Sequence, residues 1–489
     1  MNNPTGTFLA GRWVAGEGAA LIAKDPATGE VVFGGSASSE TQIDAAVKSA
    51  REALESWADC PLEQRIAILR RYAECLKSSR IEMALEISRH TGKPDWEALT
   101  EVDAMVGKVA ISVEAMTDRR TTSERQQAGA TAATRYKPMG VLAAIGPFNM
   151  PGHLPNGHIV PALLAGNTIV FKPSELTPGV GVAMAALFEK AGLPAGVLNL
   201  IQGGREAGSA LVRHADINGI LFTGSVAGGL AISKAVVDQP AKMVALEMGG
   251  NNPLVIWQAN DLDAAAYLTI QSAFITSGQR CSCARRLIMP DGPAGTAILD
   301  RIISMVGKIR VGPHTDRPEP FMGPVISDAA AANLLAAQQH LLHQGGESLI
   351  PLRSIGPRQA MLSPGLIDVT AVSDRADDEL FGPLLQVIRV GDFDAAIREA
   401  NRTRFGLAAG LFSDDAELWQ RFYSKIRAGV VYWNRQTTGG SSYLPFGGVG
   451  LSGNYRPSGY WAADYCSYPV ASMEVPALIM PSTRTPGVA

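Results

Sequence analysis

Between residues 140 and 237 the sequence alternates short apolar runs with longer amphipathic segments, and this alternation constrains the fold more than any other feature. The apolar runs are Gly140–Ile145, Thr168–Phe171, Val197–Ile201 and Ile220–Phe222, and a helical pattern follows each of them. Short apolar strands that alternate with helices are typical of βαβ units, which connect right-handedly into a parallel sheet. The sequence therefore predicts an α/β protein with a parallel sheet in this region.

The rest of the chain divides around this region. A chain of 489 residues is too long for one compact core. A second α/β pattern runs from Leu254 to Trp433, the polar stretch at 123–139 indicates a strand that leaves its domain, and Ser467–Glu474 alternates like a late strand. We predict one domain from residues 1–122 and 140–252, a second from 253–453, strands in 123–139 and 465–480, and a disordered tail at 481–489.

Composition excludes several classes of protein. Hydrophobic residues make up 46% of the chain and charged residues 18%, as in a folded enzyme. A net charge of -3 gives no basic field for nucleic acid, and no apolar run approaches the length of a membrane helix, about 20 residues. Five cysteines indicate no disulfide framework, and the first residues lack a secretory pattern. We expect a cytoplasmic protein without nucleic-acid or membrane partners.

Cys281 is the candidate nucleophile. It lies in the stretch Ser277–Arg286, which holds two cysteines among glycine and three arginines. A thiol is a nucleophile only as the thiolate, and neighbouring cations favour that form. The alternative is that Cys281 and Cys283 are core cysteines, since most free thiols are buried.

No metal site is expected. Cys281 and Cys283 form a CxC pattern without a second pair, and no carboxylate or cysteine cluster accompanies His153 and His158.

Phe222–Gly229 lies where a predicted strand ends and a helix begins. Glycines at such a junction allow close backbone approach, and the helix N-terminus offers free N–H groups to phosphate. Lys172 and Glu175 also follow a strand, where a lysine and a carboxylate can hold ribose hydroxyls. The alternatives are an ordinary turn and a solvated charged loop.

Glu247 lies in the apolar stretch Leu246–Pro253 between two strand-like runs. Apolar surroundings raise the pKa of a carboxyl, as a general base that works near neutral pH requires. The alternative is a glutamate that caps a turn.

Seven segments resemble, in order, the NAD(P)-dependent aldehyde dehydrogenase superfamily. They are Gly146–Pro151, Lys172–Glu175, Phe222–Gly229, Leu246–Gly250, Gly278–Cys281, Glu379–Pro383 and Pro445–Gly448. The match is colinear and spans nearly the whole chain. It implies that family's fold: a Rossmann-like parallel-sheet cofactor domain (1–122 and 140–252), an α/β catalytic domain (253–453) and a small β oligomerisation element (123–139 and 465–480) in a homodimer or homotetramer.

The resemblance also implies roles for the matched residues. Cys281 would attack the aldehyde carbon, while the side-chain amide of Asn149 and the backbone N–H of Cys281 would hold the oxyanion. Glu247 would activate the water that hydrolyses the resulting thioester. The cofactor would be NAD.

The implied cofactor contacts are divided among three parts of NAD. Lys172 and Glu175 would hold the adenosine ribose, Glu379 the nicotinamide ribose, and Phe381 would pack nearby. The pyrophosphate would lie on the turn formed by Gly224, Ser225, Val226, Ala227, Gly228 and Gly229.

Pro151–Pro161 and Glu247–Asn252 further resemble the branch of this superfamily that oxidises N-succinyl-L-glutamate 5-semialdehyde in the succinyltransferase pathway of arginine catabolism. Many superfamily members have lysine where this chain has Asn251 and Gly450. Neither position performs chemistry in the implied scheme, and both residues fit this branch.

Such a substrate carries several carboxylates, so its pocket needs cations, preferably arginine. Arg280, beside the nucleophile, is the first candidate, followed by Arg435 and Arg456, with His153 as a donor and Phe446 on the pocket wall. The alternative for each arginine is a surface or interdomain salt bridge.

Three other functions remain open from the sequence. The first is oxidation of another acidic semialdehyde, such as succinic or glutamic semialdehyde. The second is a CoA-acylating enzyme, against which Glu247 argues because that chemistry needs no water-activating glutamate. The third is an NAD-binding or structural protein without catalysis.

Overall fold

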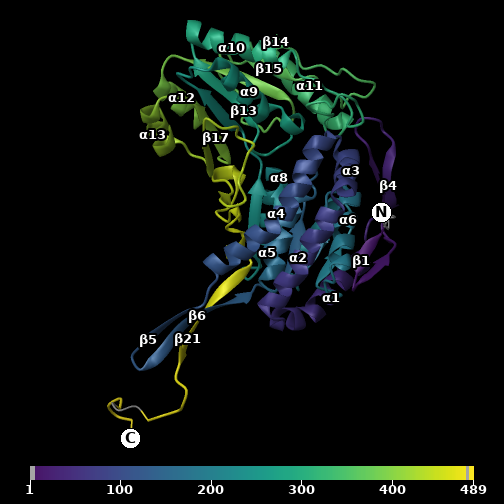
Figure 1. The fold of residues 1–489 in the computed structure, drawn as a ribbon, viewed down its shortest axis with the longest axis vertical. Helices are drawn as coiled ribbons and strands as arrows, with labels where there is room; N and C mark the ends of the chain where they lie inside the picture. The colour runs from purple at the N-terminus through teal and green to yellow at the C-terminus, as the bar shows by residue number, and fades with distance from the viewer. Residues whose placement is uncertain (1–5, 481–483, 489) are drawn as a thin grey trace.

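The computed structural model describes residues 6–480 and 484–488 and has two α/β lobes and a projecting β arm (Figure 1). The lower lobe in Figure 1 is built mainly from the first half of the chain, and the upper lobe from the second half. Of the predicted tail at 481–489, residues 481–483 and 489 lie outside the described residues.

The lower lobe contains a seven-stranded sheet. Its strands, in order across the sheet, are β11 (Met243–Met248), β10 (Gly219–Gly224), β7 (Val141–Ile145), β8 (Thr168–Lys172), β9 (Leu198–Leu200), β1 (Thr7–Leu9) and β2 (Arg12–Val14). The first five strands run parallel, and β1 and β2 extend the sheet antiparallel. The predicted parallel sheet is confirmed.

Helices cover both faces of this sheet. The crossover helices are α5 (His153–Leu164), α6 (Pro178–Lys190), α7 (Arg205–Arg213) and α8 (Val226–Ala235), and the N-terminal helices are α1 (Glu40–Asp59), α2 (Leu62–Ser78), α3 (Arg80–Thr91) and α4 (Asp95–Arg119). The hairpin of β3 (Ala20–Lys24) and β4 (Val31–Ser36) precedes them. Ser39 caps α1 in a capping box, with reciprocal hydrogen bonds to Gln42.

The upper lobe contains a second seven-stranded sheet. Its strands, in order, are β14 (Glu347–Ile350), β15 (Gly365–Asp368), β16 (Leu384–Val390), β13 (Ala284–Pro290), β12 (Asn252–Ile256), β17 (Ala408–Phe412) and β18 (Val430–Trp433). All neighbours are parallel except β14 with β15. The helices are α9 (Leu262–Ala273), α10 (Pro293–Val306), α11 (Asp328–His343), α12 (Phe393–Ala400) and α13 (Ala416–Lys425).

The chain then returns to the lower lobe. Short elements follow β18: β19 (Pro445–Phe446), which pairs with β20 (Ser458–Gly459), then the 3₁₀ turn η2 (Gly450–Ser452) and α14 (Ala462–Tyr465). Gly453 forms a backbone bridge with Glu247 of β11. The Asn454 side chain accepts a hydrogen bond from Leu246 N (3.0 Å) and donates one to Val244 O (2.8 Å), so this segment joins the edge of the first sheet.

The projecting arm is a three-stranded antiparallel sheet. It consists of β5 (Ser123–Gln127), β6 (Ala130–Pro138) and β21 (Ser467–Glu474), with β6 in the centre. The sequence indicated one strand in 123–139, whereas the structure has two, because Ala128 and Gly129 take φ values of 53° and 78° and reverse the chain tightly. The role of this arm in assembly and the division into domains stay predictions.

Among the described residues, no helix is long and apolar enough to cross a membrane.

Asn167 ties the root of the arm to the lower lobe, and its loss should destabilise the fold. Its fully buried amide accepts from Gly140 N (2.9 Å) and donates to Ala162 O (2.9 Å) and Cys466 O (2.7 Å). Asn167→Ala would leave these groups unpaired, at about 1–3 kcal/mol for each. We expect a clearly lower urea midpoint for unfolding, whereas Asn260→Ala, at an exposed position, should leave the midpoint unchanged. Equal midpoints would contradict this role.

Candidate active site

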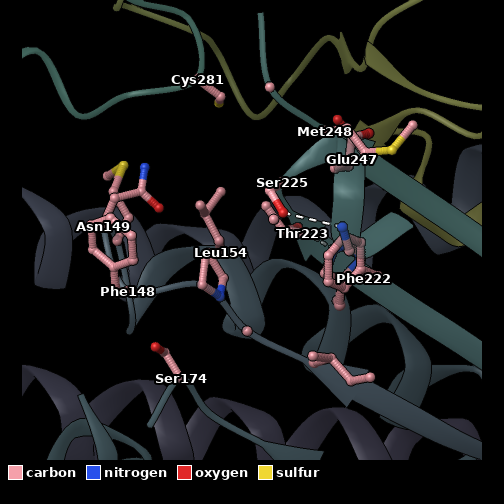
Figure 2. Close-up of a pocket in the computed structure, with 18 of the residues that line it drawn as sticks. Phe148, Asn149, Leu154, Ser174, Phe222, Thr223, Ser225, Glu247, Met248 and Cys281 are labelled. Atoms are coloured by element: carbon pink, nitrogen blue, oxygen red, sulfur yellow. Dashed lines mark hydrogen bonds between the residues drawn. The ribbon is translucent and has the colours of Figure 1, made fainter. Parts of the chain in front are cut away.

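A cavity of about 1080 Å³ is lined by residues of both lobes. Asn149, Glu247 and Cys281 all lie on its wall, although the sequence separates them widely. In Figure 2 these three side chains surround one space, with Leu154 and Thr223 lining it between them. The cavity therefore joins the three residues that the sequence analysis predicted to act together.

The backbone before Cys281 follows an uncommon path. The 3₁₀ turn η1 (Ile275–Gly278) holds Thr276, Ser277 and Gly278 in the left-handed region, with φ values of 54°, 53° and 70°. Glycine is required at 278, because a Cβ there would lie 2.1 Å from Gly382 O. The chain passes from this turn through Cys281 directly into β13.

Two buried side chains hold this turn in place. Asn252, at the start of β12, donates its side-chain N–H groups to Cys281 O (2.6 Å) and Cys283 O (2.9 Å). The buried guanidinium of Arg285 donates to Gly278 O and to Arg280 O (2.9 Å for the latter). The role of Asn252 was not predicted from the sequence, where the only signal is a polar residue at the start of an apolar strand.

The environment of Cys281 favours the neutral thiol. Burial, followed by the nearby carboxyls of Glu379 and Glu247, raises the pKa of Cys281 to about 12. Arg285 opposes this rise as a smaller influence. The arginines of this stretch therefore do not make Cys281 a thiolate in this structure. Cys283 is buried, burial raises its pKa as well, and its Sγ makes a long contact with Ile275 O (3.8 Å).

The Asn149 amide is positioned beside the Cys281 turn. Its Nδ2 donates to Gln279 O (2.8 Å), two residues before the cysteine. The carbonyl of Asn149 accepts from Nζ of Lys93 (2.8 Å), and this Nζ also contacts Glu101 Oε2 (2.6 Å) in a fully buried ion pair. Among the described residues, the Asn149 amide makes this one donation, so its second N–H can serve a group bound at Cys281.

Glu247 is a buried carboxyl inside a strand. It is the fifth residue of β11 and does not lie between two strands, so the alternative that it caps a turn is wrong. Its Oε1 accepts from Ser458 N (3.2 Å). Burial raises the pKa of Glu247 well above its ordinary value, and the Ser458 hydrogen bond opposes this rise. The predicted direction of the pKa shift agrees with the structure.

The β10–α8 junction forms another part of the cavity wall. Ser225 caps α8 and accepts from Gly228 N (3.1 Å). Gly224, Ser225, Ala227 and Gly228 line the cavity, but Val226 and Gly229 do not. Val226 packs in a hydrophobic cluster, and Gly229 lies tightly against Met248. The cofactor contacts predicted for these two residues stay predictions.

Lys172 and Glu175 lie on the cavity wall near this junction. Lys172 Nζ donates to Pro173 O (2.8 Å) and Gly203 O (2.9 Å) and lies 3.9 Å from the Glu175 carboxylate. Burial lowers the pKa of Lys172. The Glu175 side chain is 48% exposed, so its carboxylate can reach a bound group.

Glu379 and Phe381 lie toward Cys281. Glu379 Oε1 accepts from Gly250 N (3.0 Å), and Phe381 packs edge-on against Phe148. The cavity wall thus carries the carboxylates of Glu175 and Glu379 in two separate places, and the N-terminus of α8 with its small residues in a third. This arrangement fits the two ribose groups and the pyrophosphate of a nicotinamide dinucleotide.

The predicted substrate residues divide into two groups. Arg280, His153 and Phe446 line the cavity, whereas Arg435 and Arg456 have exposed side chains that are not on its wall. The substrate contacts predicted for Arg435 and Arg456 stay predictions. Burial lowers the pKa of His153 to about 4, so its imidazole is neutral.

Arg280 is already paired within the protein. Its guanidinium donates to Glu97 Oε1 and Thr276 Oγ1 (2.8 Å each) and to Thr438 O (3.3 Å). Glu97 is buried on α4, so this ion pair ties α4 to the Cys281 turn. The interdomain salt bridge that the sequence left open as an alternative is present.

The cavity also contains residues that the sequence analysis did not single out. Thr100, Ala104 and Lys108 line it from α4, at a spacing of four residues that places side chains on one helix face. This four-residue spacing was the signal in the sequence that could have identified these residues as one face of a helix. Within residues 6–480 and 484–488, no group of three or more His, Cys, Asp or Glu side chains is placed to hold a metal ion.

The pKa of Cys281 predicts slow alkylation at neutral pH. Iodoacetamide reacts with the thiolate, so with a pKa of about 12 the rate at Cys281 should rise about tenfold per pH unit between about pH 7 and pH 9. Peptide mass spectrometry of the cofactor-free protein would follow Cys281 separately from Cys60 and Cys75, and Cys281→Ser is the control. A rate that levels off near pH 7 would contradict the raised pKa.

Known proteins resemble this chain over nearly its whole length. It is 53% identical over 481 residues to an N-succinylglutamate 5-semialdehyde dehydrogenase of Pseudomonas fluorescens, covering 98% of this chain and 99% of that protein. A protein of the same name from Ectopseudomonas mendocina is 54% identical, with the same coverage.

A solved structure has the same fold. A Sinorhizobium meliloti protein described as a methylmalonate-semialdehyde dehydrogenase, solved with NAD, superposes with a TM-score of 0.92 at 27% identity and covers 97% of this chain and 98% of its own. The model of the Aldehyde dehydrogenase family matches residues 13–470. These matches and the shared cavity lead to one conclusion: the chain belongs to the aldehyde dehydrogenase family and takes a nicotinamide cofactor.

Proposed function

We propose that this protein oxidises N-succinyl-L-glutamate 5-semialdehyde to N-succinyl-L-glutamate with NAD. The observation that carries the proposal is the meeting of Asn149, Glu247 and Cys281 in one cavity with cofactor-type binding residues. The substrate comes from the two relatives of that name, which are more than half identical to this chain. The place of the reaction in arginine catabolism stays a prediction.

Each of the three residues has one chemical task. Cys281, as the thiolate, adds to the aldehyde carbon, and the Asn149 amide with the Cys281 backbone N–H stabilises the oxyanion of the thiohemiacetal. A bound nicotinamide dinucleotide supplies the hydride acceptor, which leaves a thioester on Cys281. Glu247 then removes a proton from water, and the water attacks the thioester, releases the carboxylate product and restores the cysteine.

We assign the preference for NAD over NADP to Glu175. Its carboxylate would accept hydrogen bonds from ribose hydroxyls and repel a 2′-phosphate. Lys172 would contact the same ribose, while Gly224, Ser225, Ala227 and Gly228 would hold the pyrophosphate. Glu379 would bind the nicotinamide ribose, with Phe381 beside it.

We further propose a cytoplasmic homodimer or homotetramer that assembles through the β arm. The strand β5 is exposed along its whole length and lies at an edge of its sheet. An exposed edge strand can pair with another chain, which is the physical reason for assigning assembly to this arm.

The proposed substrate can be tested against its rivals. We expect NADH formation with N-succinylglutamate semialdehyde at a higher kcat/KM than with succinic or glutamic semialdehyde, without CoA, and none with Cys281→Ala. The relatives favour this order, and Glu247 favours independence from CoA. A higher kcat/KM on succinic semialdehyde would overturn the proposed substrate. A requirement for CoA would overturn the proposed reaction.

Replacing Glu247 should block only the second half of the reaction. Glu247→Gln should lower kcat by roughly 100- to 10,000-fold, while a burst of NADH near the enzyme concentration remains. Because its raised pKa keeps Glu247 protonated at low pH, the wild-type rate of thioester hydrolysis should rise with pH and level off above that pKa. Stopped-flow measurements over a pH series would show the rise for the wild type only. An unchanged pH profile in the variant would exclude Glu247 as the base.

A further inference from the structure

Building on the proposed oxidation of an acidic semialdehyde, we propose that Lys108 of α4 binds a carboxylate of the substrate, with the His153 imidazole as a second donor. Arg280 is paired with Glu97, and Arg435 and Arg456 are exposed side chains off the cavity wall, so none of the three is an unpaired cation inside the cavity that could be the receptor of a substrate carboxylate. Lys108 and His153 supply one.

Lys108 is a buried cation that has spare donors. Its side chain is 2% exposed, and its Nζ donates to Gly459 O at 2.6 Å. A lysine ammonium has three N–H groups, and the described residues place no carboxylate within 4.0 Å of this one. Burial lowers the pKa of Lys108 to about 8. A bound carboxylate would offset the loss of hydration that this lowered pKa reflects.

The position of Lys108 suits a substrate whose aldehyde lies at Cys281. Gly459, its hydrogen-bond acceptor, follows Ser458, whose N–H donates to Glu247. Lys108 is thus in the catalytic half of the cavity. The face of α4 that carries Lys108 continues along the wall through Ala104 and Thr100, one and two helical turns earlier.

His153 can act as the second donor from the neighbouring helix. It begins α5, which packs against α4, and its Nδ1 is a buried atom without a hydrogen-bond partner among the described residues. The charge of Lys108 is close enough to contribute to the lowered pKa of His153. A neutral imidazole has one N–H, which a carboxylate oxygen can accept while the second oxygen contacts Lys108.

The other cations of the cavity have different partners or positions. Lys172 donates to two carbonyls near Glu175. Arg205 and Arg213 belong to α7, on the side of the cavity assigned to the cofactor. Among the cations that line the described cavity wall, Lys108 is therefore the one in the catalytic half without an acidic partner.

The experiment compares a dianionic and a neutral aldehyde in the same enzyme. For Lys108→Met, kcat/KM on N-succinylglutamate semialdehyde should fall roughly 10- to 100-fold more than on pentanal, mostly through KM. The matched control is Lys190→Met, at an exposed lysine of α6, which should leave kcat/KM unchanged on both aldehydes. Equal losses on both aldehydes, with NAD binding intact, would assign Lys108 to support of Gly459 and overturn the proposal.

A second pair of variants keeps Lys108 in place, so the test does not depend on whether the loss of Lys108 disturbs folding. Ala104 lies four residues before Lys108 on the cavity face, so Ala104→Asp places a competing carboxylate next to the ammonium, and Ala104→Asn is its uncharged match. We expect only the aspartate variant to lose selectivity for the dianionic aldehyde. Equal selectivity of the two variants would overturn the proposal. Failure of the proposed function gives a different result, because the wild-type enzyme itself would then not prefer the dianionic aldehyde.

Discussion

The reactive centre depends on the side-chain amide of Asn252, which binds the carbonyls of both Cys281 and Cys283. The same side chain accepts a hydrogen bond from Ala408 N (2.9 Å), so it links β12, the nucleophile turn and β17. Three consecutive left-handed residues precede the cysteine and would be costly without such support. One buried amide thus converts an unfavourable backbone path into a defined position for the thiol.

Three acidic side chains surround this centre, and little water is present to solvate their ionised forms. Burial raises the pKa of Glu247, Glu379 and Cys281 together, because each group would become an anion in the same cavity. Deprotonating one of them makes the others harder to ionise. Activation of the thiol therefore needs a change in its surroundings when cofactor or substrate binds, such as the oxyanion contacts from Asn149. The arginines beside Cys281 in the sequence do not supply this activation.

Much of the fold was predictable because its signal is local. The strand β21 has the predicted bounds, since an alternating run translates directly into a strand. The hairpin in the arm was not foreseen, because Ala128 in a left-handed turn has no distinctive sequence pattern. Cys281 and Glu247 were candidates from their local sequence, and Asn149 came from the resemblance. Asn252 and Lys108 were not found, because their roles arise from partners far away in the chain.

The sequence alone determined the α/β class and the residue types able to perform thiol chemistry, since periodicity and motif spacing are properties of short segments. Only the tertiary structure decided which charges face the cavity. It paired Arg280 with Glu97, left Arg435 and Arg456 exposed, and brought Lys108 beside Gly459, 351 residues away. The physical reason is that the partner and the exposure of a charged side chain depend on which helices pack together, and no local pattern encodes that packing.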